Sequence, residues 1–252
     1  MHKTSIKHAK LFIDSYLTKK SKILEVGSQS VNNITFKEIL NNKHEYLGVD
    51  MVSGKNVDIV QDDPYKIPFN NDTFDAVVST SAFEHTEFFW LTFNEIIRVL
   101  KPHGLFYLNA PSNGRYHKYP VDCYRFYPDS GKALQKWGKH SGYKNIVMLE
   151  SFVGKRDNGI WNDFCSIFLK DRNFIEKYPK RIISQIKDFN YGICFEKNSV
   201  INNFPSDDDN NFNILKNVLL SPLKNKFLQI IKKLLKVFGV FNLVKNLYKK
   251  IK

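Results

Sequence analysis

The sequence predicts an α/β fold in which a mostly parallel sheet carries helices on both faces. Buried strand-like runs alternate with amphipathic helical segments over the first 110 residues, and this alternation implies right-handed crossovers between parallel strands. Hydrophobic residues make up 42% and aromatic residues 14% of the chain, which is enough to build a core and excludes global disorder. The length of 252 residues predicts one sizeable domain with an appendage.

Hydrophobic spacing and turn residues place each element in order along the chain. Apolar residues at helical spacing predict helices over 3–19, 33–40, 87–100 and 128–140. Short apolar runs bounded by turn residues predict strands over 23–26, 46–49, 57–60, 74–78 and 105–108. The helix over 87–100 is expected to end at Lys101-Pro102-His103-Gly104. Two more strands, 145–149 and 164–169, are expected to form an antiparallel hairpin at the sheet edge, because no full helix separates them.

The charge distribution divides the chain into three predicted parts. Residues 1–170 form the α/β domain, 171–212 a variable insert and linker, and 213–252 a basic helical tail. The tail contains ten lysines and no acidic residue, so it supplies about +10 of the net charge of +13. The rest of the chain is therefore close to neutral, and the basic composition does not by itself indicate nucleic-acid binding by the core.

Cysteine usage and hydropathy exclude several classes of protein. The three cysteines are far apart and lack C-x-x-C spacing, which excludes a disulfide framework and a zinc knuckle. Asp207, Asp208 and Asp209 are expected to lie in a solvated loop, and no metal site is predicted. No apolar run approaches the roughly 18 residues that span a bilayer, and charges interrupt the N-terminus before a signal peptide could develop. The sequence predicts a cytoplasmic protein.

Residues at the ends of the predicted strands are candidates for ligand binding, because α/β sheets bind ligands beyond the carboxyl ends of their strands. These residues are Glu25, Gly27, Asp50, Asp62, Ser79 and Asn109. A glycine after the first strand lets the backbone approach a ligand, and an acid ending the second strand can accept both hydroxyls of a ribose. The first loop has one glycine and an acid rather than G-x-G-x-x-G, which favours a cationic or zwitterionic nucleoside over a dinucleotide.

Several ordered motifs carry a resemblance to a known family. They are Ile23-Leu24-Glu25-Val26-Gly27-Ser28, Tyr46-Leu47-Gly48-Val49-Asp50, Ile67-Pro68-Phe69, Phe74-Asp75-Ala76-Val77-Val78-Ser79, Glu84-His85 and Glu95-Ile96-Ile97-Arg98-Val99-Leu100-Lys101-Pro102-His103-Gly104. In this order they resemble the class I S-adenosylmethionine-dependent methyltransferases, in the subgroup encoded among bacterial surface-glycan (capsule-type) genes. The resemblance implies a Rossmann-like seven-stranded sheet and S-adenosyl-L-methionine as cofactor. Gln29 and Val31 depart from it, since many relatives carry glycines there.

The resemblance also implies a set of cofactor-binding residues. Glu25, Gly27 and Ser28 would lie near the amino-acid moiety, Asp50 at the ribose hydroxyls, Met51 and Asp62 at the adenine, and Ser79 at the end of the fourth strand. The alternative is that the acids are ordinary solvated residues at strand ends.

Residues on the acceptor side follow the fourth and fifth strands. His85 is expected near the methyl group as a general base for a hydroxyl; the alternative is that it braces the next helix. The loop over 109–127 is rich in donors, cations and aromatics, which suits a polar or anionic substrate. Its predicted substrate-binding residues are Arg115, Tyr116, His117, Tyr119, Tyr124 and Arg125. The alternative is that Asp122 pairs with Arg125 to fix the loop.

The resemblance implies an O-methyltransferase acting on a small glycan precursor, with two acceptor chemistries left open: a sugar hydroxyl, or a phosphate or phosphoramidate oxygen. Ser79-Thr80-Ser81-Ala82 replaces the Asn/Asp-Pro-Pro-aromatic motif of base-amine enzymes, so no nucleic-acid substrate is expected. The alternative of another class is a membrane-docking module that binds the cofactor without catalysis.

The tail has apolar residues at helical spacing, and lysines occupy much of the remaining surface. This composition favours peripheral attachment to an anionic inner-membrane surface. The alternatives are packing on the core or on a second copy, which would give a homodimer.

Overall fold

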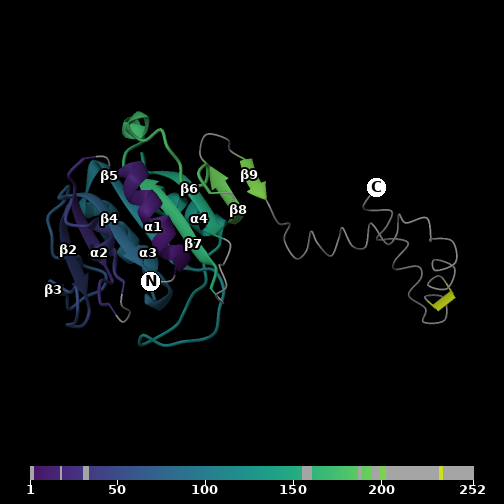
Figure 1. The fold of residues 1–252 in the computed structure, drawn as a ribbon, viewed down its shortest axis with the longest axis horizontal. Helices are drawn as coiled ribbons and strands as arrows, with labels where there is room; N and C mark the ends of the chain where they lie inside the picture. Colours follow the sequence, from purple (N-terminus) through teal and green to yellow (C-terminus); the bar gives the residue numbers. More distant parts are fainter. Residues whose placement is uncertain are drawn as a thin grey trace. The chain divides into compact units, whose positions relative to one another are not determined.

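Nine strands form one sheet within the residues that the structure describes, which are 3–17, 19–30, 34–154, 161–186, 189–194, 199–202 and 233–234 of this computed structural model (Figure 1). The strands are β1 Lys22–Val26, β2 Glu45–Asp50, β3 Ile59–Val60, β4 Phe74–Thr80, β5 Leu100–Pro111, β6 Val147–Gly154, β7 Asp163–Leu169, β8 Phe189–Cys194 and β9 Ser199–Asn202. Their order is β3-β2-β1-β4-β5-β7-β6-β8-β9. The predicted seven-stranded Rossmann-like sheet is confirmed as β1 to β7, and β8 and β9 extend it.

Strand directions follow from the connections. Strands β1 to β5 pair in parallel, whereas β7 is antiparallel to both β5 and β6. The predicted antiparallel pairing of these two strands is therefore confirmed, but their predicted position at the sheet edge is wrong, because β8 and β9 continue the sheet beyond β6. Since β4 lies on the other side of β1 from β2, the winding of the chain reverses between β1 and β4. In sheets of this kind the crevice for a ligand opens at that reversal, beyond the carboxyl ends of the strands.

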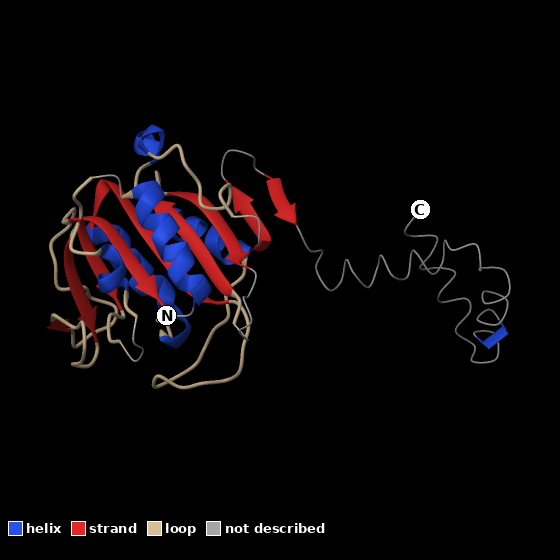
Figure 2. Cartoon of the chain, in the orientation of Figure 1, coloured by secondary structure: helices blue, strands red, loops and turns tan. Residues whose placement is uncertain are grey.

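Helices cover both faces of the sheet (Figure 2). On one face, α1 Lys3–Tyr16 and α2 Phe36–Leu40 pack in a core cluster that includes Val78 and Tyr107. On the other face, α3 Phe89–Val99 and α4 Pro128–His140 pack in a cluster that includes Val77 and Phe106. Adjacent residues of β4 and β5 thus serve opposite cores, as the two-residue period of a strand requires. The predicted α/β layering is confirmed.

Two of the helix boundaries that differ from the sequence prediction have a clear physical cause. Helix α2 begins at Phe36 rather than at 33, because the Thr35 side chain caps it and Glu38 returns the bond to the Thr35 N–H. Helix α3 ends at Val99, and Leu100 is already extended, so the predicted Lys101–Gly104 terminus lies inside β5. Leu100 pairs with Phe74 of β4, and this strand pairing, after one register shift, continues from Leu105.

The compact unit that contains the sheet runs from Met1 to Asn203, beyond the predicted domain boundary at residue 170. The short 3-10 helix η2, Arg172–Lys177, and strands β8 and β9 lie in the predicted insert, where β8 pairs with β6. These two strands were not predicted, because hydrophobic periodicity is weak in this part of the sequence. In the second unit, Phe204–Lys252, the structure describes only Lys233 and Leu234, so the predicted tail helices lie outside the described residues.

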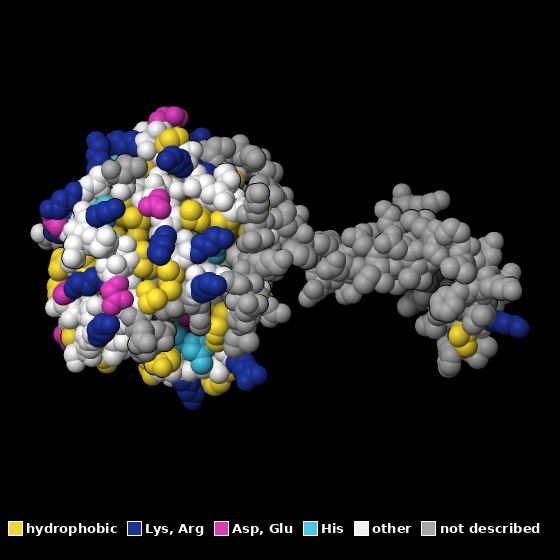
Figure 3. Space-filling view, in the orientation of Figure 1, with side chains coloured by type: hydrophobic (Ala, Val, Ile, Leu, Met, Phe, Trp, Pro, Cys, Tyr) yellow, Lys and Arg dark blue, Asp and Glu magenta, His cyan; other side chains and the backbone are white. Residues whose placement is uncertain are grey.

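The surface of the first unit mixes charge signs. Figure 3 shows lysine and arginine side chains spread among hydrophobic and acidic ones over the face that carries α1. No helix within the described ranges is long and apolar enough to cross a bilayer.

Candidate functional site

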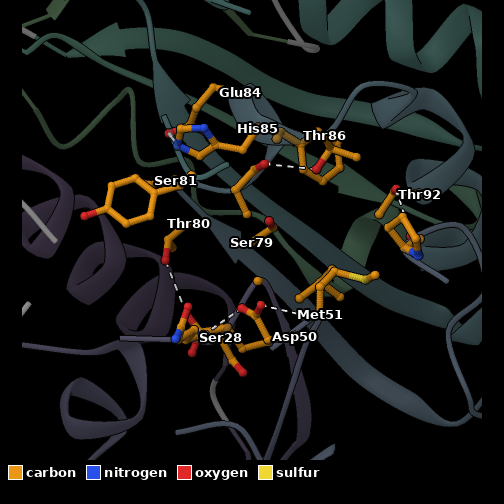
Figure 4. Close-up of a pocket in the computed structure, with 18 of the residues that line it drawn as sticks. Ser28, Asp50, Met51, Ser79, Thr80, Ser81, Glu84, His85, Thr86 and Thr92 are labelled. Carbon is orange, nitrogen blue, oxygen red and sulfur yellow. Dashed lines mark hydrogen bonds and ion pairs between the residues drawn. The ribbon is translucent and has the colours of Figure 1, made fainter. Parts of the chain in front are cut away.

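A cavity of about 930 Å³ opens at the carboxyl edge of the parallel strands. Its walls come from the loops after β1, β2 and β4, from the 3-10 helix η1 (Phe83–His85) and from part of the segment 111–121. Figure 4 shows Asp50 and Met51 at one end and Glu84 and His85 at the other, with Ser79 between them. The cavity therefore occupies the ligand crevice that the winding of the sheet predicts.

The loop after β1 turns on a glycine. Gly27 has a φ of 77°, and a Cβ at this position would lie 2.3 Å from the Cβ of Ala82. The N–H groups of Gly27 and Ser28 both donate to the Val49 carbonyl, at 3.0 and 3.1 Å. Only glycine combines this backbone conformation with so close an approach, so the loop can bring its main chain to the cavity wall.

Asp50 ends β2 with both carboxylate oxygens held by main-chain donors. Its Oδ2 accepts from the Gln29 N–H at 2.8 Å, and its Oδ1 accepts from the Met51 N–H at 2.7 Å. An ionised carboxylate oxygen accepts more than one hydrogen bond, so Oδ2 keeps an acceptor position, and Oδ1 can exchange a long 3.4 Å bond from the Val52 N–H for a ligand donor. The carboxylate is thus oriented to receive two further donors, such as the hydroxyls of a diol.

Glu25 lies deeper, in β1, and is 4% exposed. Its carboxyl accepts hydrogen bonds from the Tyr46 hydroxyl and from the Thr80 hydroxyl, the latter at 3.2 Å. Burial nevertheless raises the pKa of Glu25 to about 7, because these two hydrogen bonds only partly offset the loss of solvent. A cation bound in the cavity would favour the ionised form.

In addition to Glu84 Oε2 in η1, three buried polar atoms in the cavity wall have no hydrogen-bond partner among the described residues. They are Ser28 Oγ, Gln61 Oε1 and Ser79 Oγ. Leaving a buried polar atom unpaired costs about 1–3 kcal/mol, so such atoms normally receive a ligand or an ordered water. The three atoms follow or end β1, β3 and β4, and together with Asp50 they fit a polar ligand that crosses several strand ends, as a nucleoside does.

The end of β3 contributes Gln61, whereas the sequence analysis selected Asp62. The Gln61 N–H donates to the Asp50 carbonyl at 2.9 Å, which continues the pairing of β2 with β3, and the residue is 7% exposed. Asp62 is exposed and is not part of the cavity wall. Met51 lines the cavity as predicted, with its Sδ 3.9 Å from Gln61 Nε2.

Glu84 and His85 form the acceptor end of the cavity. His85 Nδ1 lies 2.5 Å from the Val121 carbonyl, which can only accept, so Nδ1 carries the proton and Nε2 keeps its lone pair in the neutral ring. Burial lowers the pKa of His85 below its ordinary value. Glu84, 1% exposed, lies with Oε1 3.7 Å from His85 Nε2, and burial raises the pKa of its carboxyl to about 8. The hydrogen bond of His85 to the Val121 carbonyl braces the loop after β5 rather than the following helix α3.

The loop after β5 is fixed by the pairing of Asp122 with Arg125. Arg125 Nη1 and Nη2 donate to the two Asp122 oxygens at 2.6 and 2.8 Å, and they also reach the carbonyls of Tyr124 and Arg115. The Asp122 carboxylate also accepts from the His117 N–H at 2.8 Å. These contacts with Arg125 hold the pKa of Asp122 far below its ordinary value. The guanidinium is committed to the loop itself.

Only part of the predicted acceptor-binding set meets the cavity. His117 and Tyr119 line it, whereas Arg115, Tyr116, Tyr124 and Arg125 do not. The Tyr124 ring packs edge-on against Phe89, and its hydroxyl donates to the Glu87 carbonyl at 2.8 Å. The Cys123 N–H donates to the Glu84 carbonyl at 2.7 Å, which attaches this part of the loop to η1.

Sequence reasoning missed Asp163. This residue begins β7, is 4% exposed, accepts a hydrogen bond from the Thr4 hydroxyl and lines the cavity. Because β7 is antiparallel to β5, its first residue pairs with Pro111 at the carboxyl edge of the parallel strands. The predicted antiparallel hairpin could have indicated this position for Asp163, because the start of an antiparallel strand lies beside the carboxyl ends of the parallel strands.

Comparisons with known proteins agree with the fold. Residues 24–108, from β1 to β5, match the family model described as a methyltransferase domain. No curated protein matches the sequence. A structure of the Burkholderia thailandensis 1,6-didemethyltoxoflavin-N1-methyltransferase, with 1,6-didemethyltoxoflavin and S-adenosylhomocysteine bound, is similar at 13% identity and a TM-score of 0.52, covering 65% of this chain and 77% of that one. A SAM-dependent methyltransferase from Aquifex aeolicus has 15% identity and a TM-score of 0.45, covering 67% of this chain and 99% of that one.

Proposed function

We propose that the chain is a class I S-adenosylmethionine-dependent methyltransferase, on the basis of the methyltransferase-domain match over residues 24–108 and the fold, and that it methylates a hydroxyl oxygen on a small sugar precursor of a bacterial surface polysaccharide. One observation carries the proposal. A single cavity runs from Asp50 to His85, so that a cofactor held at the strand ends and an acceptor beside His85 would meet within it. Its volume of about 930 Å³ lies near the upper end of the range of ligand pockets, which leaves space for both molecules.

We place the cofactor along the strand ends. The two oriented oxygens of Asp50 receive the ribose hydroxyls, and Met51 packs on the adenine. Gln61, whose Oε1 lacks a partner within the described residues, takes the adenine role first given to Asp62. Glu25, Gly27 and Ser28 lie at the amino-acid moiety, and Ser79 forms the floor between the two ends of the cavity.

The acceptor end supplies alignment and a base. S-adenosylmethionine supplies a methyl group on a positively charged sulfur. The acceptor oxygen attacks the methyl carbon in line with the carbon–sulfur bond, and the sulfur leaves. His85 Nε2, with its lone pair directed away from the bonded Nδ1, takes the proton that the acceptor hydroxyl loses as the new carbon–oxygen bond forms. The proton then remains on the imidazole until it is released to solvent. Such a base contributes roughly 10²–10⁴-fold to the rate.

The charge of the cavity favours a neutral hydroxyl as the acceptor. Carboxyl groups outnumber basic groups in the wall, which contains Glu25, Asp50, Glu84, Glu87 and Asp163 but one lysine, Lys118. Burial raises the pKa of Glu25 to about 7 and that of Glu84 to about 8, so these two are partly protonated at neutral pH and the negative charge comes mainly from the other three. Arg125, the strongest candidate for an anion, is held by Asp122. Sugar hydroxyls donate to carboxylates, whereas a phosphoryl group would be repelled by them. A phosphate or phosphoramidate oxygen remains the second candidate acceptor, on the observation that Lys118, His117 and Tyr119 stand together at one side of the cavity.

The alternative of a cofactor-binding module without catalysis is not favoured. Such a module would have a blocked cavity on the methyl side, but here the cavity continues past Ser79 to His85 and His117.

A screen of acceptors tests the proposal directly. Purified protein is incubated with S-adenosylmethionine carrying a labelled methyl group and with nucleotide-linked sugars, free phosphosugars and phosphoramidates, and label transfer is measured. We expect transfer to an oxygen of a sugar-bearing compound. Transfer only to RNA, DNA or protein would contradict the proposal, and transfer only to the phosphoramidates would replace the first acceptor by the second.

The affinity for S-adenosylmethionine is expected to weaken as the pH falls below about 7. The pKa of Glu25 is raised to about 7, and a cationic ligand beside it binds the ionised form preferentially. The fraction of ionised Glu25, and with it the affinity, decreases as the pH falls, by up to about tenfold per pH unit. Calorimetric titrations between about pH 6 and pH 8.5 measure the effect. The Glu25→Gln variant, which cannot titrate, should flatten the profile, and an equally flat profile in the unaltered protein would remove Glu25 from the cation's surroundings.

We propose further that residues 213–252 attach the protein reversibly to an anionic membrane surface. The ten lysines of this segment lack an acidic partner within it, and each contributes about 1 kcal/mol near such a surface. We expect the full chain to sediment with anionic vesicles at low salt, to be released at high salt and to ignore neutral vesicles. A chain ending at Asn211 should not sediment. Equal sedimentation of both chains would leave packing on the core or homodimer formation as the role of the tail.

A further inference from the structure

Two histidines and a glutamate meet at the acceptor end of the cavity, although the sequence predicted no metal site. The ligand atoms offered by Glu84, His85 and His117 all lie within 4.8 Å of one another. Glu84 and His85 belong to η1, and His117 belongs to the loop after β5, so the fold brings together residues that are far apart in the chain. The two imidazole rings contact each other edge to face, with centroids 4.9 Å apart.

Both histidines have the ring nitrogen Nδ1 occupied by an acceptor. His85 Nδ1 donates to the Val121 carbonyl at 2.5 Å. His117 Nδ1 lies 3.2 Å from the Arg115 carbonyl and 3.4 Å from an Asp122 carboxylate oxygen, and both of these can only accept. Each ring therefore carries its proton on Nδ1 and leaves the Nε2 lone pair unused. A histidine held in this way by a carbonyl or carboxylate is the usual arrangement of a metal ligand.

Glu84 gives an independent indication of a ligand. The residue is 1% exposed, and its Oε2 has no hydrogen-bond partner among the described residues. Its other oxygen, Oε1, stands 3.7 Å from His85 Nε2. A buried carboxylate with one oxygen unpaired is costly unless a positive charge lies beside it. The neutral imidazole of His85 presents a lone pair to Glu84 and supplies no such charge.

We propose that Glu84, His85 and His117 bind a divalent transition-metal cation whose remaining coordination positions face the cavity. Two imidazoles and one carboxylate suit zinc, manganese, iron(II) or cobalt(II) and are poor ligands for magnesium or calcium, which require mostly oxygen. Bonds of about 2.0–2.1 Å place tetrahedral ligand atoms roughly 3.4 Å apart. Glu84 Oε1 and His85 Nε2, 3.7 Å apart, already approach this spacing. His117, on the loop after β5, supplies the third ligand atom, within 4.8 Å of the other two.

Asp122 and Arg125 hold His117 in position for the proposed cation site. Asp122 lies against His117 through both its N–H and its Nδ1, and Arg125 fixes the Asp122 carboxylate with two hydrogen bonds. The arginine that the sequence suggested as a substrate ligand is thus a positioning residue for His117. Three protein ligands leave at least one position open, which is the arrangement of a catalytic rather than a structural metal site.

The role of the cation in catalysis rests on the proposed function. A sugar hydroxyl bound at the open position, with a neighbouring hydroxyl at a second position, loses its proton more readily because the cation stabilises the alkoxide. The proton goes to solvent, the oxygen forms its bond to the methyl carbon, and the carbon–sulfur bond breaks with its electron pair on sulfur. With the cation bound, His85 Nε2 is a ligand, and activation by the cation replaces removal of the proton by His85.

Metal binding by the full chain, without tag, cofactor or acceptor, tests the site itself. The protein is freed of metal with a chelator and titrated with Zn²⁺ by calorimetry and with Co²⁺ by visible absorption. We expect one equivalent of each cation to bind, with intense cobalt bands typical of four or five ligands, and no displacement by millimolar Mg²⁺. His117→Ala and Glu84→Gln should each weaken binding by at least tenfold, whereas His140→Ala, an exposed histidine of α4, should not change it.

Melting curves of each variant establish that it is folded, and His117→Ala, on a loop, is decisive if Glu84→Gln is unstable. Failure of the parent protein to bind one equivalent, or equal affinity of the His117→Ala variant, would overturn the cation site. That outcome leaves the proposed function intact with His85 as the base. Conversely, failure of the acceptor screen does not affect a titration made without acceptor.

Discussion

Replacing His85 with alanine is expected to lower the turnover of the acceptor by roughly 10²–10⁴-fold, the contribution of a positioned base. His85 stands at the opposite end of the cavity from Asp50, so the affinity for S-adenosylmethionine should stay within about twofold of its original value. Initial rates at saturating cofactor and calorimetric titration of the cofactor measure the two quantities separately. The His140→Ala variant serves as the matched control.

The pH profile separates the two ways in which His85 can act. Burial lowers the pKa of His85 below its ordinary value, so Nε2 keeps its lone pair through the neutral range. Activity that depends on this base is present above that pKa and is lost as the pH falls through it. Activity that depends on a bound cation instead disappears with a chelator at any pH and returns with added metal. A His85→Ala enzyme within fivefold of the original rate would contradict both roles.

Replacing Asp50 with alanine is expected to weaken S-adenosylmethionine binding by at least tenfold. Its two carboxylate oxygens are already oriented by the Gln29 and Met51 N–H groups, so they bind two hydroxyls without rearrangement. A hydrogen bond to a charged group contributes about 1.5–3 kcal/mol, and about 1.4 kcal/mol corresponds to a tenfold change in affinity. Calorimetry with S-adenosylmethionine and S-adenosylhomocysteine measures the loss, which should be similar for both.

Asp62 provides the control for this experiment. It is a carboxylate twelve positions further on, exposed and outside the cavity wall, so Asp62→Ala should leave the affinity unchanged. Gln61→Ala, which removes the amide whose Oε1 is unpaired within the described residues, should weaken binding. A larger loss in Asp62→Ala than in Gln61→Ala would restore the original assignment of the adenine contact.

Much of the fold could be predicted from the sequence because the relevant signals are local. The alternation of helical and strand periods is enough to place β1, β2 and β4, and with them the loop at Gly27 and the carboxylate of Asp50. The sequence selected Asp62, which lies outside the cavity wall, rather than its neighbour Gln61, because β3 has only two residues, Ile59 and Val60, and so short a strand gives no period from which to tell which neighbour points inward.

The acceptor side was less predictable because its geometry depends on contacts between distant segments. The composition of its loop favours Arg125 as a substrate ligand. Only the fold shows that both Nη groups of Arg125 donate to the Asp122 carboxylate. Glu84 was noted only as part of a motif, since nothing local indicates that it is buried beside His85. His117 lies near Glu84 and His85 only because the folded loop after β5 packs against η1.

The hydrogen bond from Cys123 to Glu84 has a practical consequence for observing the site. Cys123 is exposed, whereas Cys165 and Cys194, the other two cysteines of the chain, are buried. A thiol-selective reagent can therefore attach a fluorophore at one position, on the loop segment that Glu84 anchors and His117 shares. Emission from that position would follow the loop in real time as cofactor, cation or acceptor enters, so compounds can be ranked by binding before any methylated product has been identified.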